Sequence, residues 1–66
     1  MKFKELDTVR VLKDLSNEIK QGSIGVVLMR FNSPQEAYEV EFVDGKGMTI
    51  AEYAVDAVYL EKINLT

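Results

Sequence analysis

Apolar residues recur at every second position in short runs separated by turn-forming residues, and this pattern constrains the fold more than any other feature of the sequence. The clearest run covers 37–43, where Tyr38, Val40 and Phe42 alternate with two glutamates. Successive side chains of a β-strand point to opposite faces, so this run predicts a strand with one buried and one solvated face. The chain is therefore expected to be mostly β.

The same pattern predicts five strands, at residues 8–12, 24–31, 37–43, 48–51 and 58–62. The loop over 13–21 can contain one helical turn capped by Ser16, and a second helical turn is expected over 53–58. Gly25 indicates a bulge or a close backbone approach inside the second strand. A bulge there turns the later apolar residues of that strand, Met29 and Phe31 among them, toward the core.

A hairpin is predicted at 44–47, because Asp-Gly-Lys-Gly lies between two apolar runs. One register of this hairpin pairs Phe42 with Met48. The same register pairs Val40 with Ile50, which places apolar side chains together on the inner face. A shift by one residue would mix the two faces, so the pattern favours this register.

These elements predict an all-β fold, a small five-stranded SH3-like barrel with one short helical turn before the last strand, formed by residues 1–66 as a single domain. A chain of 66 residues has a small core, since a domain near that size buries only about 60% of its unfolded surface. The sequence contains no cysteine and no histidine, so disulfides are excluded and a structural zinc site is not expected. Pairing with a second copy of the chain is the remaining common source of extra stability.

Three motifs occur in order: Leu-Asp-x-Val at 6–9, Gly-x-x-Gly-x-Val at 22–27 and Tyr-x-Val-Glu-Phe at 38–42. In these motifs the chain resembles a family of short bacterial SH3-like barrel proteins catalogued as a domain of unknown function. The resemblance covers residues 6 to about 62, and it implies an SH3-like fold without any activity. The turn at 22–27 is also similar, more loosely, to that of KOW-type domains in ribosomal and transcription proteins.

The charge balance argues against nucleic acid as a partner. The net charge is −3, the sequence pI is about 4.8, and the eight basic residues are scattered along the chain. Nucleic-acid backbones repel such a surface unless basic residues cluster. No nucleic-acid partner is therefore expected.

The longest apolar run, 26–29, is far shorter than a membrane helix requires. A cytoplasmic protein without a membrane partner is expected.

Catalysis has little support in the sequence, so no enzyme, metal or cofactor is expected. The three serines lie in predicted turns, and no histidine is present to act as their base. Glu39 and Glu41 lie two apart on one strand face, where they could bind a cation or act as acid and base. The simpler interpretation is the solvated face of a half-buried strand.

Five residues are candidates for binding. Tyr53 and Tyr59 flank the predicted helical turn, where they could line a peptide groove, although core closure is the simpler role. Leu12, Leu28 and Val43 have the outward parity and could form an apolar patch that pairs two copies of the chain.

The leading hypothesis is a non-catalytic interaction module that binds another protein and associates with itself. The first alternative is a small KOW-like barrel associated with nucleic acid. The second is a minor enzyme or metal-dependent protein that uses the acidic face.

Overall fold

The computed structural model describes residues 2–64, so the first residue and the last two of the predicted domain lie outside the described residues. Five antiparallel strands form one sheet in the order β4-β3-β2-β1-β5. Their bounds are β1 Thr8–Val11, β2 Ile24–Phe31, β3 Ala37–Val43, β4 Thr49–Asp56 and β5 Leu60–Lys62. A 3₁₀ turn, η1, covers Ala57–Tyr59 before the last strand. The predicted all-β SH3-like barrel is confirmed.

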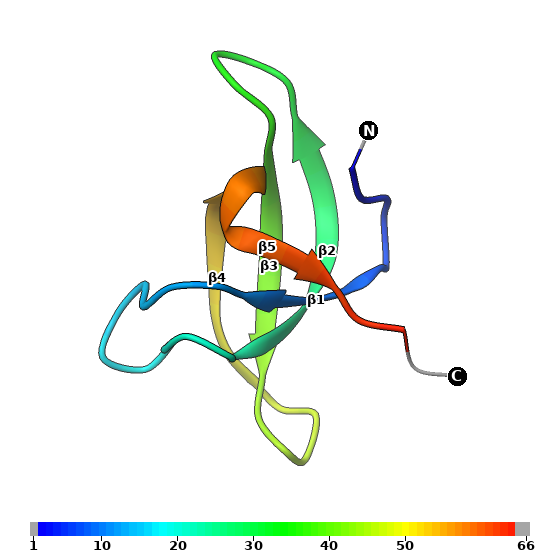
Figure 1. Ribbon diagram of the computed structural model, residues 1–66. Coiled ribbons are helices and arrows are strands. Elements are labelled where there is room, and N and C mark those ends of the chain that lie inside the picture. The colour runs from blue at the N-terminus through cyan, green and yellow to red at the C-terminus, as the bar shows by residue number, and fades with distance from the viewer. Residues whose placement is uncertain (1, 65–66) are drawn as a thin grey trace.

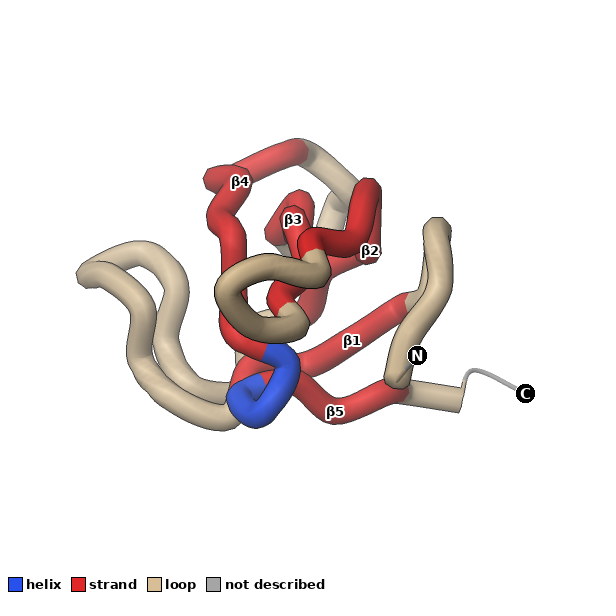
Figure 2. Tube along the Cα trace, turned by 90° about the horizontal axis from the view of Figure 1, so that it is seen from above, coloured by secondary structure: helices blue, strands red, loops and turns tan. Residues whose placement is uncertain are grey.

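The strands form two layers. β2, β3 and β4 run side by side, and β1 and β5 cross them (Figure 1). The view from above shows the crossing pair lying against one side of the three-stranded layer (Figure 2). η1 connects the two ends of the sheet, β4 and β5. No helix among residues 2–64 is long and apolar enough to cross a membrane.

The core lies between these two layers, and β3 is its centre. Tyr38, Val40 and Phe42 are fully buried, as the alternation in 37–43 predicts. Val9 and Val11 of β1 cover them from the crossing layer. The other buried apolar residues are Phe3, Ile19, Val27, Val55, Ala57 and Leu60.

Gly25 makes the close backbone approach that the sequence predicts. A Cβ atom at this position would lie 2.5 Å from Cγ1 of Val40 and 2.8 Å from the carbonyl oxygen of Glu41. A side chain here would therefore overlap β3. The bulge of this strand lies elsewhere, because the pairing with β3 shifts between Val27 and Met29.

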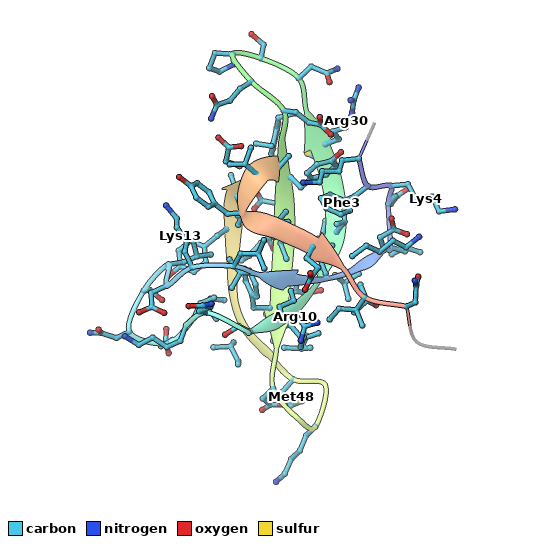
Figure 3. All side chains as sticks on the ribbon, viewed as in Figure 1. Phe3, Lys4, Arg10, Lys13, Arg30 and Met48 are labelled. Atoms are coloured by element: carbon cyan, nitrogen blue, oxygen red, sulfur yellow. The ribbon has the colours of Figure 1, made fainter. Side chains whose placement is uncertain are left out.

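The predicted register of the 44–47 hairpin is wrong. Phe42 pairs with Ala51, whereas Met48 is 66% exposed and Ile50 is 39% exposed. Asp44 explains the difference, because its Oδ1 accepts the backbone N–H of Lys46 at 2.8 Å and that of Met48 at 3.0 Å. These bonds hold Met48 in the loop, away from the barrel (Figure 3).

The helical turn expected over 53–58 is also placed too early, because β4 continues through Asp56. Ala51, Tyr53 and Val55 alternate inward along this strand and pack against the core. Because apolar residues at every second position face one side only in a strand, burying these three side chains favours a strand over a helix. The turn begins where Asp56 accepts the backbone N–H of Val58.

The long loop over 13–21 contains a turn organised by Ser16 but no helix. The Ser16 hydroxyl accepts the backbone N–H groups of Glu18 at 3.2 Å and Ile19 at 3.1 Å. This turn directs Ile19 into the core, where it is fully buried. The sequence pattern did not identify Ile19 as a core residue, because no alternation surrounds it.

We expect Gly25→Ala to destabilise the fold by roughly 1–3 kcal/mol, the usual cost of inserting a methyl group into a packed site. Gly45→Ala is the matched control, because nothing lies within 4 Å of the added Cβ atom. Its cost should stay within about 0.5 kcal/mol. Urea unfolding of the two variants measures both values, and equal costs would contradict the close packing of β2 on β3.

Candidate functional site

The side of β2, β3 and β4 that points away from the core forms a continuous surface, which we call the outer face. The strand register arranges it in three rows across the sheet. From one end to the other, the rows are Phe31–Ala37–Asp56, Met29–Glu39–Ala54 and Val26–Glu41–Glu52.

Along β2, the outer face is apolar. Met29 is 54% exposed and Phe31 is 37% exposed, contrary to the expectation that both point inward. The bulge after Val27 is the reason, because it changes the side to which the following residues point. The strand therefore places two large apolar side chains in solvent.

Along β3 and β4, the outer face is acidic. These two strands contain Glu39, Glu41, Glu52 and Asp56 and no basic residue, whereas all eight basic residues of the chain lie elsewhere. Four of the eleven acidic residues of the chain thus lie together on one side of the sheet. The outward position expected for Glu39 and Glu41 is confirmed.

The acidic side chains interact with one another. The pKa of Glu39 lies above its ordinary value, mainly because its carboxyl group shares a hydrogen bond with Glu52, and partial burial and the charge of Glu52 act in the same direction. Glu41 instead accepts a hydrogen bond from the Thr49 hydroxyl, at 2.6 Å. The carboxylates of Glu39 and Glu52, which are close enough to share a hydrogen bond, repel each other when both are ionised.

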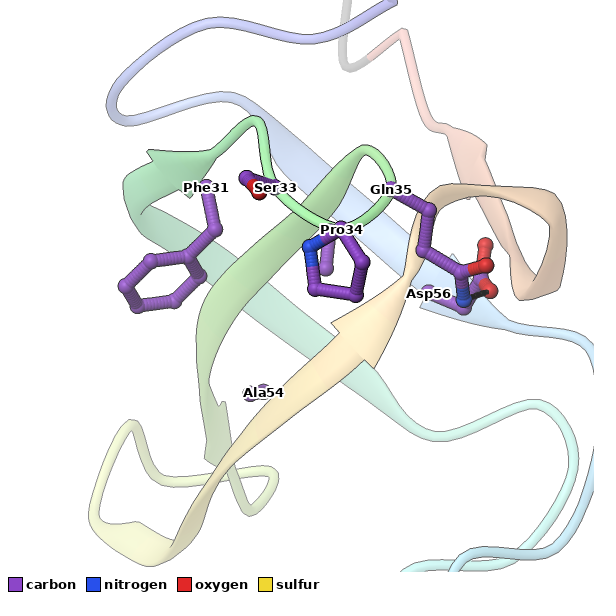
Figure 4. A pocket seen from close by; sticks show the side chains of 7 residues that line it. Phe31, Ser33, Pro34, Gln35, Ala54 and Asp56 are labelled. Carbon is purple, nitrogen blue, oxygen red and sulfur yellow. Dashed lines mark hydrogen bonds between the residues drawn. The ribbon is translucent and has the colours of Figure 1, made fainter.

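A shallow pocket of about 520 Å³ lies at the Phe31 end of the outer face. Its lining residues come from β2, β3, β4 and the loop between β2 and β3: Phe31, Ser33, Pro34, Gln35, Ala37, Ala54 and Asp56. Figure 4 shows Phe31 and Asp56 on opposite sides of Pro34, with Ala54 below. The two alanines are small, and their size leaves the space open.

Glu36 fixes the loop that lines this pocket. Its carbonyl oxygen accepts the backbone N–H of Ala57 at 3.1 Å. Its carboxylate accepts the hydroxyl of Tyr38 and the backbone N–H of Lys2, the latter at 3.1 Å. These bonds lower the pKa of Glu36, the Tyr38 bond most and the Lys2 bond next. Burial, followed by this bond, raises the pKa of Tyr38.

Asp56 closes the other end of the pocket. One carboxylate oxygen accepts the side-chain amide of Gln35, and the other accepts the backbone N–H of Val58 at 3.1 Å. The two bonds hold the carboxylate in one orientation at the edge of the pocket.

A second pocket, of about 310 Å³, lies beside the N-terminal segment. It is lined by Lys2, Phe3, Lys4, Asp7 and Lys62 (Figure 3 labels Phe3 and Lys4). The fold thus brings Lys62 beside Lys2 and Lys4, which are far from it in the sequence. Lys62 already forms an ion pair with Asp7, at 3.7 Å.

The five predicted binding residues line neither pocket. Tyr53 is half-buried against Phe42, with ring centroids 6.4 Å apart. Tyr59 is partly exposed beneath the ammonium group of Lys13, which lies 3.9 Å from the ring centroid. The groove that was expected to use both tyrosines stays a prediction.

The predicted aliphatic patch stays a prediction as well. Leu12 is exposed, and its backbone N–H donates to the carbonyl oxygen of Tyr59 at 2.7 Å. Leu28 occupies the bulge of β2, and Val43 ends β3 opposite Thr49. No strand pairing among the described residues places these three side chains in one row. Within residues 2–64, no group of three or more acidic side chains is arranged to hold a metal ion.

A known protein family matches most of the chain. The model of the family described as Domain of unknown function (DUF4926) matches residues 5–62. The chain belongs to this family. The membership expected from the three motifs is therefore confirmed, and the DUF4926 family has no assigned activity. Neither the curated proteins nor the solved structures contain a match to the chain.

We expect Glu36→Gln to lower the free energy of unfolding at neutral pH, because it removes the ionised acceptor of the Tyr38 hydroxyl. The lowered pKa of Glu36 means that its contribution is present above the ordinary carboxyl pKa and is lost as the pH falls through the lowered value. The difference from wild type should therefore shrink in acid. Urea unfolding at several pH values measures it, with Glu18→Gln, in the exposed loop, as control. A difference that grows in acid would contradict the assignment.

Proposed function

We propose that this protein is a non-catalytic binding module that docks a positively charged segment of another protein on its outer face. One observation carries the proposal: on the outer face, the apolar side chains of β2 lie directly beside the acidic side chains of β3 and β4. We call the exposed Met29 and Phe31 of β2 the apolar column. A segment that presents basic side chains beside apolar ones complements this surface in both respects.

Exposure of the apolar column supports binding. Met29 and Phe31 lie side by side on β2, two residues apart, next to the open pocket. Contiguous apolar surface that is rimmed by charge is typical of an interaction site on a soluble protein. Aromatic and methionine side chains are also enriched in protein interfaces.

The charge pattern supports a basic partner. The outer side of β3 and β4 carries acidic side chains and no basic one. The pKa of Glu39 is raised there, mainly by its hydrogen bond with Glu52, then by burial and by the charge of Glu52. When both carboxylates are ionised they repel each other. A basic side chain placed between the two would replace this repulsion with attraction. Complementary potential mainly raises the association rate and the specificity of binding.

Self-association stays a prediction. A two-fold pairing of outer faces would set the carboxylates of one copy against those of the other, which is unfavourable. The expected dimer through Leu12, Leu28 and Val43 would use other surfaces. Such a dimer would leave the outer face open to a partner.

Nucleic-acid binding is the second candidate, and the gathering of Lys2, Lys4 and Lys62 around one pocket favours it. The net charge of −3 and the ion pair of Lys62 with Asp7 oppose it. We therefore expect protein rather than nucleic acid to be the partner. Duplex DNA is the third probe in the test that follows.

The test uses two fluorescent peptides with the same apolar residues, one with arginine and lysine and the other with glutamate at the intervening positions. We expect only the basic peptide to bind, and its affinity should fall as added salt screens the charges. The acidic peptide and duplex DNA should not bind. Fluorescence anisotropy measures all three.

The variant Glu39→Gln/Glu52→Gln should weaken binding of the basic peptide by about fivefold or more. The variant Glu5→Gln/Glu18→Gln removes the same charge from exposed sites off the outer face and is the matched control. Equal effects of the two variants would show that net charge, and not the outer face, attracts the peptide. Stronger binding of DNA than of the basic peptide would favour the second candidate.

A further inference from the structure

The pocket at the Phe31 end of the outer face differs chemically from the rest of that face. Its two sides are unlike, with the apolar rings of Phe31 and Pro34 toward one side and the carboxylate of Asp56 at the other (Figure 4). Phe31, Ala37 and Asp56 form one row across three strands, so the two ends are separated by two strand spacings, about 10 Å.

We propose that this pocket is an anchor site for an arginine side chain of the partner. The proposal rests on the proposed function and specifies the residue that the outer face recognises. The aliphatic stem of the arginine lies against Phe31 and Pro34 over the alanine floor. Its guanidinium group meets the carboxylate of Asp56.

The size of the pocket suits a long side chain. Its volume of about 520 Å³ is open to solvent on one side. The floor consists of Ala37 of β3 and Ala54 of β4, so nothing larger than a methyl group projects from the floor into the space. A long side chain with an apolar stem and a charged end can bury its stem on such a floor while the charged end stays at the rim.

Asp56 selects for a charged occupant. Both of its oxygens accept hydrogen bonds, but no basic group among residues 2–64 balances its charge. An apolar side chain would bury that charge uncompensated, which costs free energy, whereas a cation compensates it. The neighbouring row adds Glu39, which pairs across the sheet with Ala54 of the pocket floor, so the potential at this end of the face is negative as well.

The fixed orientation of Asp56 favours arginine over lysine. Gln35 and the N–H of Val58 hold one carboxylate oxygen each. A carboxylate fixed in this way suits the planar fork of a guanidinium group, which donates two parallel hydrogen bonds. An ammonium group cannot make this paired contact.

The probe is N-acetyl-arginine N-methylamide, titrated into ¹⁵N-labelled protein at low salt. We expect the amide shifts to concentrate in residues 31–37 and 54–56. The citrulline derivative has nearly the same shape without the charge, and the lysine derivative has the charge without the planar group. Both should bind about fivefold more weakly or worse. Equal binding of either derivative, or shifts centred elsewhere, would overturn the proposal.

Two variants test the site itself. Ala54→Leu fills the pocket and keeps every charge, and Asp56→Asn removes the charge while its side-chain oxygen can still accept the N–H of Val58. Each should weaken binding of the arginine derivative by about fivefold. Met48→Phe adds apolar bulk at an exposed site in the hairpin loop, beyond the opposite end of the β3–β4 pairing from the pocket, and should change nothing. Unchanged affinity in Ala54→Leu, with a native spectrum, would contradict the pocket as the site.

The outcomes separate this inference from the proposed function. If the basic peptide binds Ala54→Leu as tightly as wild type, the anchor is wrong and the outer face remains the docking surface. If the arginine derivative binds at the pocket but neither peptide binds, the anchor site stands and the proposed function fails.

Discussion

The alternation of side chains along β3 is the constraint on which the rest of this structure depends. Tyr38, Val40 and Phe42 on one side of the strand form the centre of the core. Glu39 and Glu41 on the other side form the centre of the outer face. Because one strand carries both sets, a slip by one residue would bury the carboxylates and expose the core. Fold and candidate site are therefore specified together.

Neighbouring strands adjust to β3 through irregularities that the sequence pattern does not reveal. In β2, the absence of a side chain at Gly25 lets the strand lie against Val40 and Glu41, and the bulge after Val27 then turns Phe31 outward. In the hairpin, the hydrogen bonds of Asp44 lengthen the loop by holding Met48. Each irregularity occurs where local backbone bonding, rather than side-chain alternation, decides the geometry.

This distinction explains how far prediction from sequence succeeded. The buried face of β3 could be predicted from the alternation of its side chains. The close approach of β2 to β3 could be predicted because Gly25 has no side chain. The register of β4 could not be deduced, because Met48, Ile50 and Ala51 all have apolar side chains and several pairings satisfy the pattern. The family was expected from a resemblance in three motifs, and the match of the family model over residues 5–62 shows it.

The pocket was missed for a related reason. Phe31 was assigned to the core because the bulge was placed at Gly25, and Pro34 lies in a loop that carries no periodic signal. Ala54 and Asp56 were assigned to a helical turn. The pocket exists because β4 is longer than expected and brings both residues beside β3. The gathering of lysines beside the N-terminus likewise depends on the pairing of β1 with β5, between residues distant in sequence.

In the proposed function, the acidic outer face binds a partner at some expense of the stability of the fold. Replacing Glu39 with glutamine removes the repulsion from Glu52 and keeps the shape of the side chain. The pKa of Glu39 is raised mainly by its hydrogen bond with Glu52, then by burial and by the charge of Glu52. The ionised pair is therefore unfavourable at neutral pH and is relieved as the pH falls through the raised pKa of Glu39.

The direct measurement is the free energy of unfolding of Glu39→Gln relative to wild type, from neutral to acidic pH. The account predicts a variant more stable by about 0.2–1 kcal/mol at neutral pH, the usual size of a cross-strand charge interaction, with the difference vanishing in acid. A variant that is less stable than wild type at neutral pH would contradict it, because the carboxylate would then be stabilising the fold.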